Sequence, residues 1–337
     1  MQIQKLTAVD AFIVFDLDGA PAAGITRSAP KILRDGATAL ARTLTYRFAS
    51  FERRVGGASA GINAKPDDRA AAVAAYVDEV GPLVAAGRFL TDPGRGVSAE
   101  GLAALVALDP RPDDYWTRAD ALTGVSVAVA AVVAAGGLEG ATVAMEGFDA
   151  SGPAIAAGLA EQGARLVAVS TAEGTATGPG FEPGELAERW SAQGPELVAG
   201  LGPTEALGRP DAVFGVAADV LVTGSRSGVV DDAVAAGLGA RVLVPSGPTP
   251  VTAKALAGLR RADKVVVPDF ISTAGPMFAG WPDEGSPDPA RAAADAVRAV
   301  LGEVLDHPDG PLLASCYRAE AFLATWCEQL PFGRPIA

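Results

Sequence analysis

The chain of 337 residues is long enough to form two domains that each bury a core of apolar side chains. Its 40 acidic and 27 basic residues give a net charge of -13, which repels polyanions, so we expect no nucleic-acid partner. A hydrophobic fraction of 49% is typical of a folded globular protein and excludes disorder as the default.

The first part of the chain mixes short β-like runs with helix-like ones. Residues 11–17 form an apolar run typical of a strand, whereas residues 30–46 and 67–86 have the length and composition of helices. The most apolar run, residues 121–135, stops at a Gly-Gly pair and is shorter than the roughly 20 residues that cross a bilayer. We therefore predict a buried helix there and no membrane partner.

From residue 138 onward the pattern becomes regular. An apolar run at 142–146, a Gly-containing turn, a helical stretch at 153–162 and a second run at 165–170 predict strand, turn, helix and strand. Later strands are expected at 219–223, 241–245 and 264–268, with helices at 231–237 and 251–259. Continuous apolar strands separated by helices predict a doubly wound, Rossmann-type parallel sheet that is covered on both faces.

The last part reads as a linker followed by helices. Residues 280–289 are rich in Pro, Gly and Asp and indicate a linker or hinge. Helices are expected at 290–305 and 312–329.

The cysteines and the histidine restrict the chemistry. Cys316 and Cys327 lie eleven residues apart, which is about 16 Å along a straight helix and beyond disulfide reach. This spacing, and an N-terminus without the segments of a signal peptide, predict a reduced, cytoplasmic protein. Because the only histidine, His307, lies in a turn-like segment, we expect neither a His-based metal site nor a Ser-His-Asp triad.

Eight short motifs follow one another along most of the chain: Gly24-Ile25-Thr26-Arg27, Leu44-Thr45-Tyr46-Arg47, Gly56–Ile62, Thr91–Gly94, Gly140–Phe148, Ser246–Thr249, Val267-Pro268-Asp269 and Ala274-Gly275. Their series resembles that of the Glu/Leu/Phe/Val dehydrogenases, which reads G-G-x-R, M-T-Y-K, G-G-G-K, D-V-G, G-F-G-N-V-G, N-G-P-T, V-P-D and A-N-A-G-G. The resemblance implies an α/β protein with an N-terminal substrate and dimerisation domain (1–117) and a Rossmann-like domain (118–284). C-terminal helices (285–337) would pack back on the first domain.

The resemblance also implies an activity, the reversible NAD(P)-dependent oxidative deamination of an L-amino acid. In the family a lysine with a lowered pKa activates water, an aspartate shuttles protons and a second lysine holds the substrate carboxylate. Three functions stay open for this chain: a divergent amino-acid dehydrogenase, a non-catalytic member that acts as a ligand sensor or oligomer partner, and a non-redox enzyme for an amino-acid-like substrate. A homo-oligomer, at least a dimer, is expected in each case.

Ser59 is the main departure, because it stands where the family has its catalytic lysine. A neutral hydroxyl neither carries the cation that stabilises developing negative charge nor exchanges protons near neutral pH. The loss of one such group typically reduces the rate about 100- to 1,000-fold. Lys65, six residues further along, is a possible replacement for the amine.

The other expected substrate-site residues are a mixed set. Asp92 matches the proton-shuttling aspartate, although an Asp before Pro93-Gly94 also suits a turn. Arg47 matches the carboxylate-holding lysine and keeps its charge, although it is one of several arginines nearby and could simply be solvated. The resemblance adds Arg27, Gly56, Gly57, Ala121 and Thr273 as substrate contacts.

The expected dinucleotide turn comprises Gly147, Phe148, Asp149, Ala150, Ser151 and Gly152. Asp149 replaces the second glycine of GxGxxG, where the backbone approaches the pyrophosphate at a helix N-terminus. Repulsion between two unit charges 4 Å apart is about 4 kcal/mol at an effective dielectric of 20, which weakens binding about a thousandfold. Asp149 can instead accept the free N–H groups at the helix start.

Further cofactor contacts are expected at the ends of later strands, at Thr171, Thr223 and Ser246. Thr171 stands where the family often has an acidic residue for the adenosine ribose, and Glu173 is close enough in sequence to substitute. No Arg or Lys cluster indicates a 2′-phosphate pocket. The cofactor is therefore expected to be NAD or NADP, with a slight preference for NAD and with weak binding.

Overall fold

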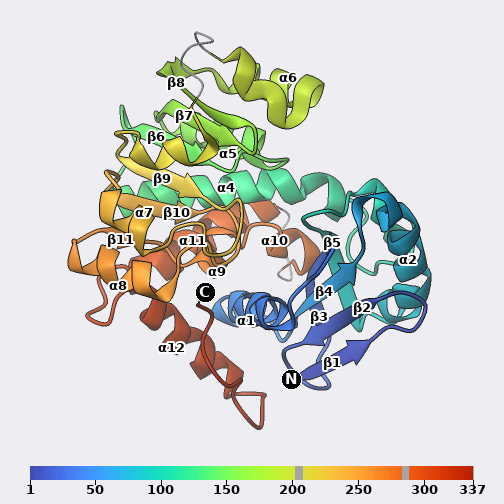
Figure 1. The fold of residues 1–337 in the computed structure, drawn as a ribbon. Helices are drawn as coiled ribbons and strands as arrows, with labels where there is room; N and C mark the ends of the chain where they lie inside the picture. The colour runs from blue at the N-terminus through green and yellow to red at the C-terminus, as the bar shows by residue number, and fades with distance from the viewer. Residues whose placement is uncertain (202–207, 283–287, 337) are drawn as a thin grey trace. The chain divides into compact units, whose positions relative to one another are not determined.

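The computed structural model describes residues 1–201, 208–282 and 288–336, which form two compact units. The first unit combines Met1–Arg111 with Cys316–Pro335, and the second consists mainly of Pro112–Ser315 (Figure 1). The helix over residues 289–304 belongs to the second unit, and only the residues after 315 belong to the first. The domain boundary expected at 284 lies outside the described residues.

The first unit contains a five-stranded sheet of order β1-β2-β4-β3-β5. Strands β1 and β2 pair antiparallel, as do β2 and β4, whereas β3 runs parallel to both β4 and β5. Helix α1 (Arg34–Ser50) packs on β4, and α2 (Arg69–Ala85) contacts β4 and β5. The strands are β1 (Gln2–Lys5), β2 (Ala11–Phe15), β3 (Ala22–Ala29), β4 (Gly56–Asn63) and β5 (Phe89–Pro93).

Small residues allow α1 to approach β4 closely. A Cβ atom on Gly57 would lie 1.9 Å from the carbonyl oxygen of Ala41, so only glycine fits at this contact. The buried Thr45 hydroxyl then accepts a hydrogen bond of 2.9 Å from the Gly57 backbone N–H. The glycine pair and the preceding Thr-Tyr-Arg segment therefore join helix and strand at one point.

We expect Thr45→Val to destabilise the protein by about 1–3 kcal/mol, because it leaves the buried Gly57 N–H without its acceptor. Urea unfolding followed by circular dichroism measures this change. Thr38→Val in the same helix is the control, since the Thr38 hydroxyl makes no hydrogen bond to any residue that the structure describes. Equal stability of the two variants would contradict the assignment.

The second unit contains a six-stranded sheet of order β11-β10-β9-β6-β7-β8. All its pairs are parallel except β7 with β8, which form an antiparallel edge. Chain order reverses direction between β6 and β9, which makes their carboxyl ends the switch point of a doubly wound fold. The strands are β6 (Thr142–Glu146), β7 (Arg165–Thr171), β8 (Gly174–Phe181), β9 (Val220–Thr223), β10 (Val242–Pro245) and β11 (Val265–Val266).

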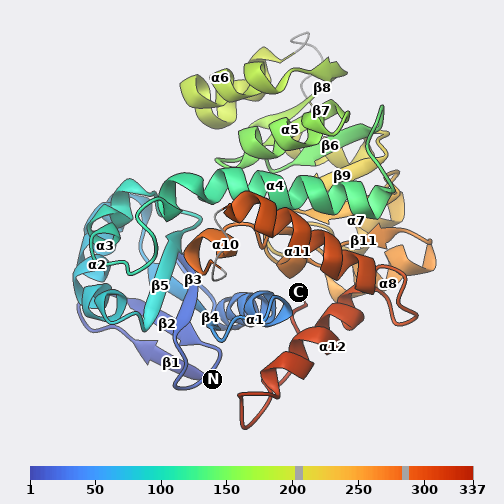
Figure 2. The same cartoon turned by 180° about the vertical axis from the view of Figure 1, so that it is seen from behind.

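Alternating residues of these strands face two layers of helices. One face packs on η5 (Pro210–Gly215), α7 (Asp232–Gly237) and α8 (Ala253–Arg261). On the other face lie α4 (Tyr115–Ala135) and α5 (Gly152–Glu161), and α11 (Pro289–Val304) packs on α4 (Figure 2). The sheet is thus covered on both sides, which confirms the predicted α/β, Rossmann-like architecture.

Helix α4 contains the most apolar run and extends further than expected, from Tyr115 to Ala135. By length and composition alone it passes the test for a membrane span, which core helices also pass. It packs against α5 and α11 within the second unit. Where α4 crosses α5, Gly124 is so close to the Ala154 carbonyl that a Cβ would lie 2.5 Å from it.

The remaining elements are short or lie at the edges. They are η1 (Pro66–Asp68), η2 (Glu100–Leu102), α3 (Ala103–Val106), α6 (Pro183–Gln193), η3 (Gly194–Gly200), α9 (Asp269–Ser272), α10 (Met277–Gly280) and α12 (Pro311–Leu323). The expected final helix therefore ends at Leu323 and not at residue 329. The centre of the predicted linker at 280–289 lies outside the described residues.

Candidate functional site

Three of the expected site residues lie on one face of the first sheet. Ser59 on β4 pairs with Ile25 on β3, and Ile25 pairs with Asp92 on β5. Arg27 stands two residues beyond Ile25, so its side chain projects to the same face. Gly57, two residues before Ser59, contacts α1 from this face. The face that carries Arg27, Ser59 and Asp92 is therefore the α1 face.

Ser59 is fully buried, and the Arg27 guanidinium contacts its hydroxyl, with Nη2 3.4 Å from Oγ. The first unit contains three lysines, Lys5, Lys31 and Lys65, and all three are exposed. Lys65 follows the end of β4 and is about 20 Å along the strand direction from Ser59, which exceeds the reach of its side chain. We therefore do not expect Lys65 to replace the missing amine.

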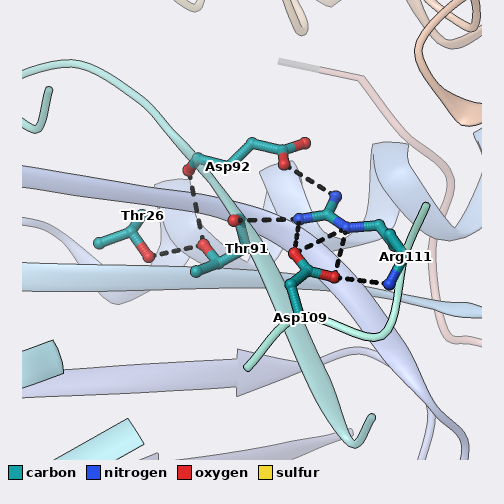
Figure 3. A network of polar contacts seen from close by, with 5 residues as sticks. All are labelled: Thr26, Thr91, Asp92, Asp109 and Arg111. Atoms are coloured by element: carbon teal, nitrogen blue, oxygen red, sulfur yellow. Dashed lines mark hydrogen bonds and ion pairs between the residues drawn. The ribbon is translucent and has the colours of Figure 1, made fainter. Parts of the chain in front are cut away.

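Asp92 is held by a buried arginine that the sequence analysis did not single out. Arg111 Nη1 donates to Asp92 Oδ1 at 2.8 Å, and the same guanidinium contacts both carboxylate oxygens of Asp109 (Figure 3). The Arg111 side chain is 2% exposed and that of Asp92 is 34% exposed. An ion pair of this kind occupies one of the carboxylate oxygens and fixes the position of the group. The arrangement suits a fixed acceptor better than a mobile proton carrier.

Behind this network, hydroxyl groups join β3 to β5 and to α2. Thr26 Oγ1 lies 2.7 Å from both Thr91 Oγ1 and Tyr76 Oη. All three residues are buried, and burial raises the pKa of the Tyr76 phenol above its ordinary value, so it stays neutral. These bonds hold the strand that presents Asp92 in place.

The other expected substrate residues lie in different surroundings. Arg47 lies in the last turn of α1 and is half-buried, and Gly56 begins β4 next to the Gly57 contact described above. Ala121 is exposed on α4, and Thr273 is buried after α9, where its hydroxyl donates to the Asp269 carbonyl at 2.6 Å. Ala121 and Thr273 belong to the second unit. Within the first unit, therefore, only the residues on the first sheet lie together.

The expected dinucleotide turn follows β6 at the switch point of the second sheet. Gly147 has a φ of 79°, and a Cβ there would lie 2.6 Å from Ser225, so glycine is required. The Phe148 ring packs against Gly152 and stands edge-on to Trp190, with ring centroids 5.8 Å apart. The backbone framework of the turn is thus present.

Glu146, directly before this turn, is a buried carboxylate that the sequence analysis did not single out. Its Oε2 accepts from the Thr223 hydroxyl at 2.8 Å and from the backbone N–H groups of Gly224 and Ser225 at 3.0 and 3.2 Å. These donors at the end of β9 are therefore used by the protein's own anion. A charged residue ending the apolar run 142–146 was the available signal.

The Asp149 carboxylate accepts a hydrogen bond from one of the N–H groups at the start of α5, as the helix-capping interpretation of this residue predicts. Its Oδ1 lies 3.0 Å from the Ser151 backbone nitrogen. The residue as a whole is exposed, but its carboxylate lies against the helix start and loses hydration there. This loss of hydration, together with the charge of Asp120, raises the pKa of Asp149 to about 6. The Ser151 hydroxyl in turn donates to Asp120 Oδ1 at 2.8 Å.

The remaining expected cofactor residues make contacts within the protein. The Thr171 hydroxyl donates to the Pro195 carbonyl at 2.7 Å, and Thr223 is bound to Glu146 as described. Ser246 follows β10, and the backbones of Gly224 and Gly247 touch beside it. Ala150 and Glu173 are exposed. Among the residues that the structure describes, no cluster of His, Cys, Asp and Glu could hold a metal ion.

Comparison with known proteins places these observations in context. Residues 117–279 match the family model described as Glutamate/Leucine/Phenylalanine/Valine dehydrogenase. The chain is 24% identical over 292 residues to NADP-specific glutamate dehydrogenase A1 of Halobacterium salinarum, covering 77% of this chain and 68% of that protein. It is 33% identical over 158 residues to glutamate dehydrogenase of Aeropyrum pernix, covering 45% and 37%.

Solved structures share the fold along almost the whole chain. The hetero-hexameric glutamate dehydrogenase from Thermus thermophilus, in its leucine-bound form, has a TM-score of 0.76 and 22% identity, and the match covers 93% of this chain and 83% of that chain. L-tryptophan dehydrogenase from Nostoc punctiforme has a TM-score of 0.65 and 19% identity, with 96% of each chain covered.

Proposed function

The chain belongs to the Glu/Leu/Phe/Val dehydrogenase family, and on this premise we propose that it binds an amino acid or 2-oxo acid without catalysing NAD(P)-linked oxidative deamination. One observation carries this proposal. Ser59, which the resemblance matches to the catalytic lysine, is fully buried, and every lysine of its unit is exposed. Without a protonatable amine beside the reacting carbon, water activation and charge stabilisation both fail.

Two further observations support the loss of catalysis. The Asp92 carboxylate is in an ion pair with Arg111, and carboxylates lie directly before the dinucleotide turn, at Glu146, and within it, at Asp149. The first reduces the freedom of the proton shuttle, and the second opposes a pyrophosphate at the turn. Three separate parts of the family's machinery are therefore altered in the same direction.

A divergent dehydrogenase, with NAD or NADP as weakly bound cofactor, is the second candidate. It is favoured by the intact Rossmann-type strand order and by Gly147 and Gly152, which keep the turn geometry. In that case Asp92 would carry the proton shuttle. The two relatives reported above are glutamate dehydrogenases, and their activity suggests the chemistry of this candidate.

Assembly and location belong to the same proposal. We propose that the protein acts in the cytoplasm as an oligomer, either with itself or with a catalytic relative. The hetero-hexameric glutamate dehydrogenase of Thermus thermophilus, in its leucine-bound form, illustrates both mixed assembly and amino-acid binding in a protein of this fold. A non-catalytic subunit that senses an amino acid would fit such an assembly.

A ligand screen combined with a turnover assay tests the function. The twenty L-amino acids and their 2-oxo acids are screened by thermal shift, and NADH or NADPH formation is followed with each amino acid at alkaline pH. We expect at least one compound to stabilise the protein, by about 2.7 kcal/mol at 100 times its Kd, and no reduced cofactor to form.

Asp92→Asn is the control for trace activity, because it removes turnover by this chain but not by a contaminating enzyme. Turnover of about 1 per second or faster that Asp92→Asn abolishes would refute the proposal in favour of the second candidate. The absence of any stabilising compound would refute the binding part.

A further inference from the structure

Arg27 is a half-buried cation that lacks an anionic partner among the described residues. Within residues 1–201, 208–282 and 288–336, its one side-chain hydrogen bond is to the Ser59 hydroxyl, and its Nε is buried without a hydrogen-bond partner. Loss of hydration lowers the pKa of the guanidinium from its ordinary value. A desolvated charge without a counter-charge is unfavourable, and a bound anion removes the penalty.

The described residues around Arg27 do not supply a negative charge that pairs with its guanidinium. Gly94, at the end of the neighbouring strand, touches the Arg27 side chain, and a Cβ there would lie 3.1 Å from its Cγ. The carboxylate on the same sheet face, Asp92, is bound by Arg111 and does not neutralise Arg27. The positive charge of Arg111 is itself matched by Asp92 and Asp109.

We propose that Arg27 and Ser59 form a subsite for the carboxylate of a small organic acid, at the place where relatives have the catalytic lysine. The planar guanidinium presents N–H groups that fit a carboxylate, and the buried Ser59 hydroxyl, which accepts from Arg27 Nη2, positions the guanidinium. This inference rests on the proposed function for the identity of the acid, but not for the subsite itself. It names Arg27 as the anchor in place of Arg47.

The subsite has a chemical consequence that a lysine-based site lacks. Arginine keeps its charge throughout the accessible pH range, so the subsite binds a carboxylate with constant strength from about pH 6.5 to 9.5. Neither Arg27 nor Ser59 exchanges protons in this range, so the two side chains of the subsite supply no general acid or base. Binding without turnover follows from the geometry of one sheet face.

Propionate and propionamide test the subsite independently of side-chain specificity. They are similar in size and shape, and only propionate carries the charge. We expect about 50 mM propionate to raise the Tm relative to sodium chloride of equal ionic strength, with a millimolar Kd, and propionamide to leave the Tm unchanged. The propionate Kd, measured by ligand-observed NMR, should be constant over the stated pH range.

Substitutions assign the binding to Arg27. Arg27→Gln should weaken propionate binding about 10- to 100-fold, whereas Arg95→Gln, which removes an exposed charge on the adjacent loop, should leave it unchanged. Arg27→Lys should retain binding near neutral pH and lose it as the pH rises. Arg27→Met should be at least as heat-stable as the native chain, which shows that lost binding is not lost folding.

The outcomes separate this inference from the proposed function. Propionate binding that Arg27→Gln leaves unchanged overturns the subsite, even if an amino acid binds the native protein. Propionate binding that depends on Arg27 supports the subsite, even if every amino acid and 2-oxo acid of the screen fails. Equal effects of propionate and propionamide also overturn it.

Discussion

Asp149→Gly should raise the affinity for NAD by up to about a thousandfold, because it removes a carboxylate from the place where the backbone meets a pyrophosphate. The substitution is compatible with the turn, since the resemblance matches Asp149 to a glycine of the family's motif. Isothermal titration of the native and variant proteins with NAD at pH 8 measures the difference.

The NAD affinity of the native protein should also depend on pH, through the charge of the Asp149 carboxylate. The pKa of Asp149 is raised to about 6, so the carboxylate is charged at pH 8 and becomes neutral as the pH falls below about 6. NAD binding to the native protein should therefore strengthen by up to about tenfold per pH unit from pH 8 to 6 and then level off.

Asp149→Asn and Asp120→Asn serve as controls for that pH dependence. The first removes the charge but keeps a side-chain oxygen for the Ser151 N–H, and its NAD affinity should not vary with pH. The second removes only the neighbouring charge that raises the pKa, so the dependence should persist at a slightly lower pH. A pH-independent affinity of the native protein would show that Asp149 does not govern the turn.

Ser59→Lys, introduced into the Asp149→Gly variant, should increase amino-acid oxidation about 100- to 1,000-fold over Asp149→Gly alone. The Arg27 guanidinium contacts the Ser59 hydroxyl at 3.4 Å, so a lysine at position 59 is both buried and beside another cation. Both effects lower the pKa of the new amine toward neutrality, where it can exchange protons. NADH formation with a panel of amino acids, measured from pH 7 to 10, gives the rate.

Ser59→Met in the same background is the matched control, because its side chain is almost as long but carries no amine. Its rate should equal that of Asp149→Gly alone. Adding Arg27→Gln to the lysine variant should shift the lower limit of its pH profile to higher pH, since one cause of the depressed pKa is gone. Equal rates for the lysine and methionine variants would show that position 59 is not the place of the missing chemistry.

Sequence patterns predicted the second unit better than the first. The expected strand at 142–146 coincides with β6, and the other four expected strands differ from the observed ones by a few residues, because continuous apolar runs between helices leave few alternatives. The edge strand β8 was not expected, because its Gly- and Thr-rich sequence is not a continuous apolar run. In the first unit, β4 reads Gly-Gly-Ala-Ser-Ala-Gly-Ile-Asn, which has neither strand propensity nor alternation. Its strand conformation depends on three neighbours, β2, β3 and α1.

Several residues of the candidate site were recognisable only by resemblance or by structure. Ser59, Asp92 and Asp149 were singled out by the resemblance to the family's motifs, whereas Arg111 gave no signal because its partner Asp92 lies 19 residues earlier. Glu146 was included in a strand and not considered as a charge. Ion pairs between segments distant in sequence have no local pattern, so sequence periodicity does not reveal them.

The amino-acid sequence by itself indicated the family resemblance, the doubly wound second unit and a serine at the position that the resemblance matches to the catalytic lysine, because each depends on residue identity, order or local periodicity. Only the tertiary structure decided which charges face one another. It bound Asp92 to Arg111, gave the Asp149 carboxylate to the start of α5 and left Arg27 beside Ser59 without an anion. The reason is that electrostatic partnership depends on distance and burial, which the chain acquires when separate strands and helices pack together.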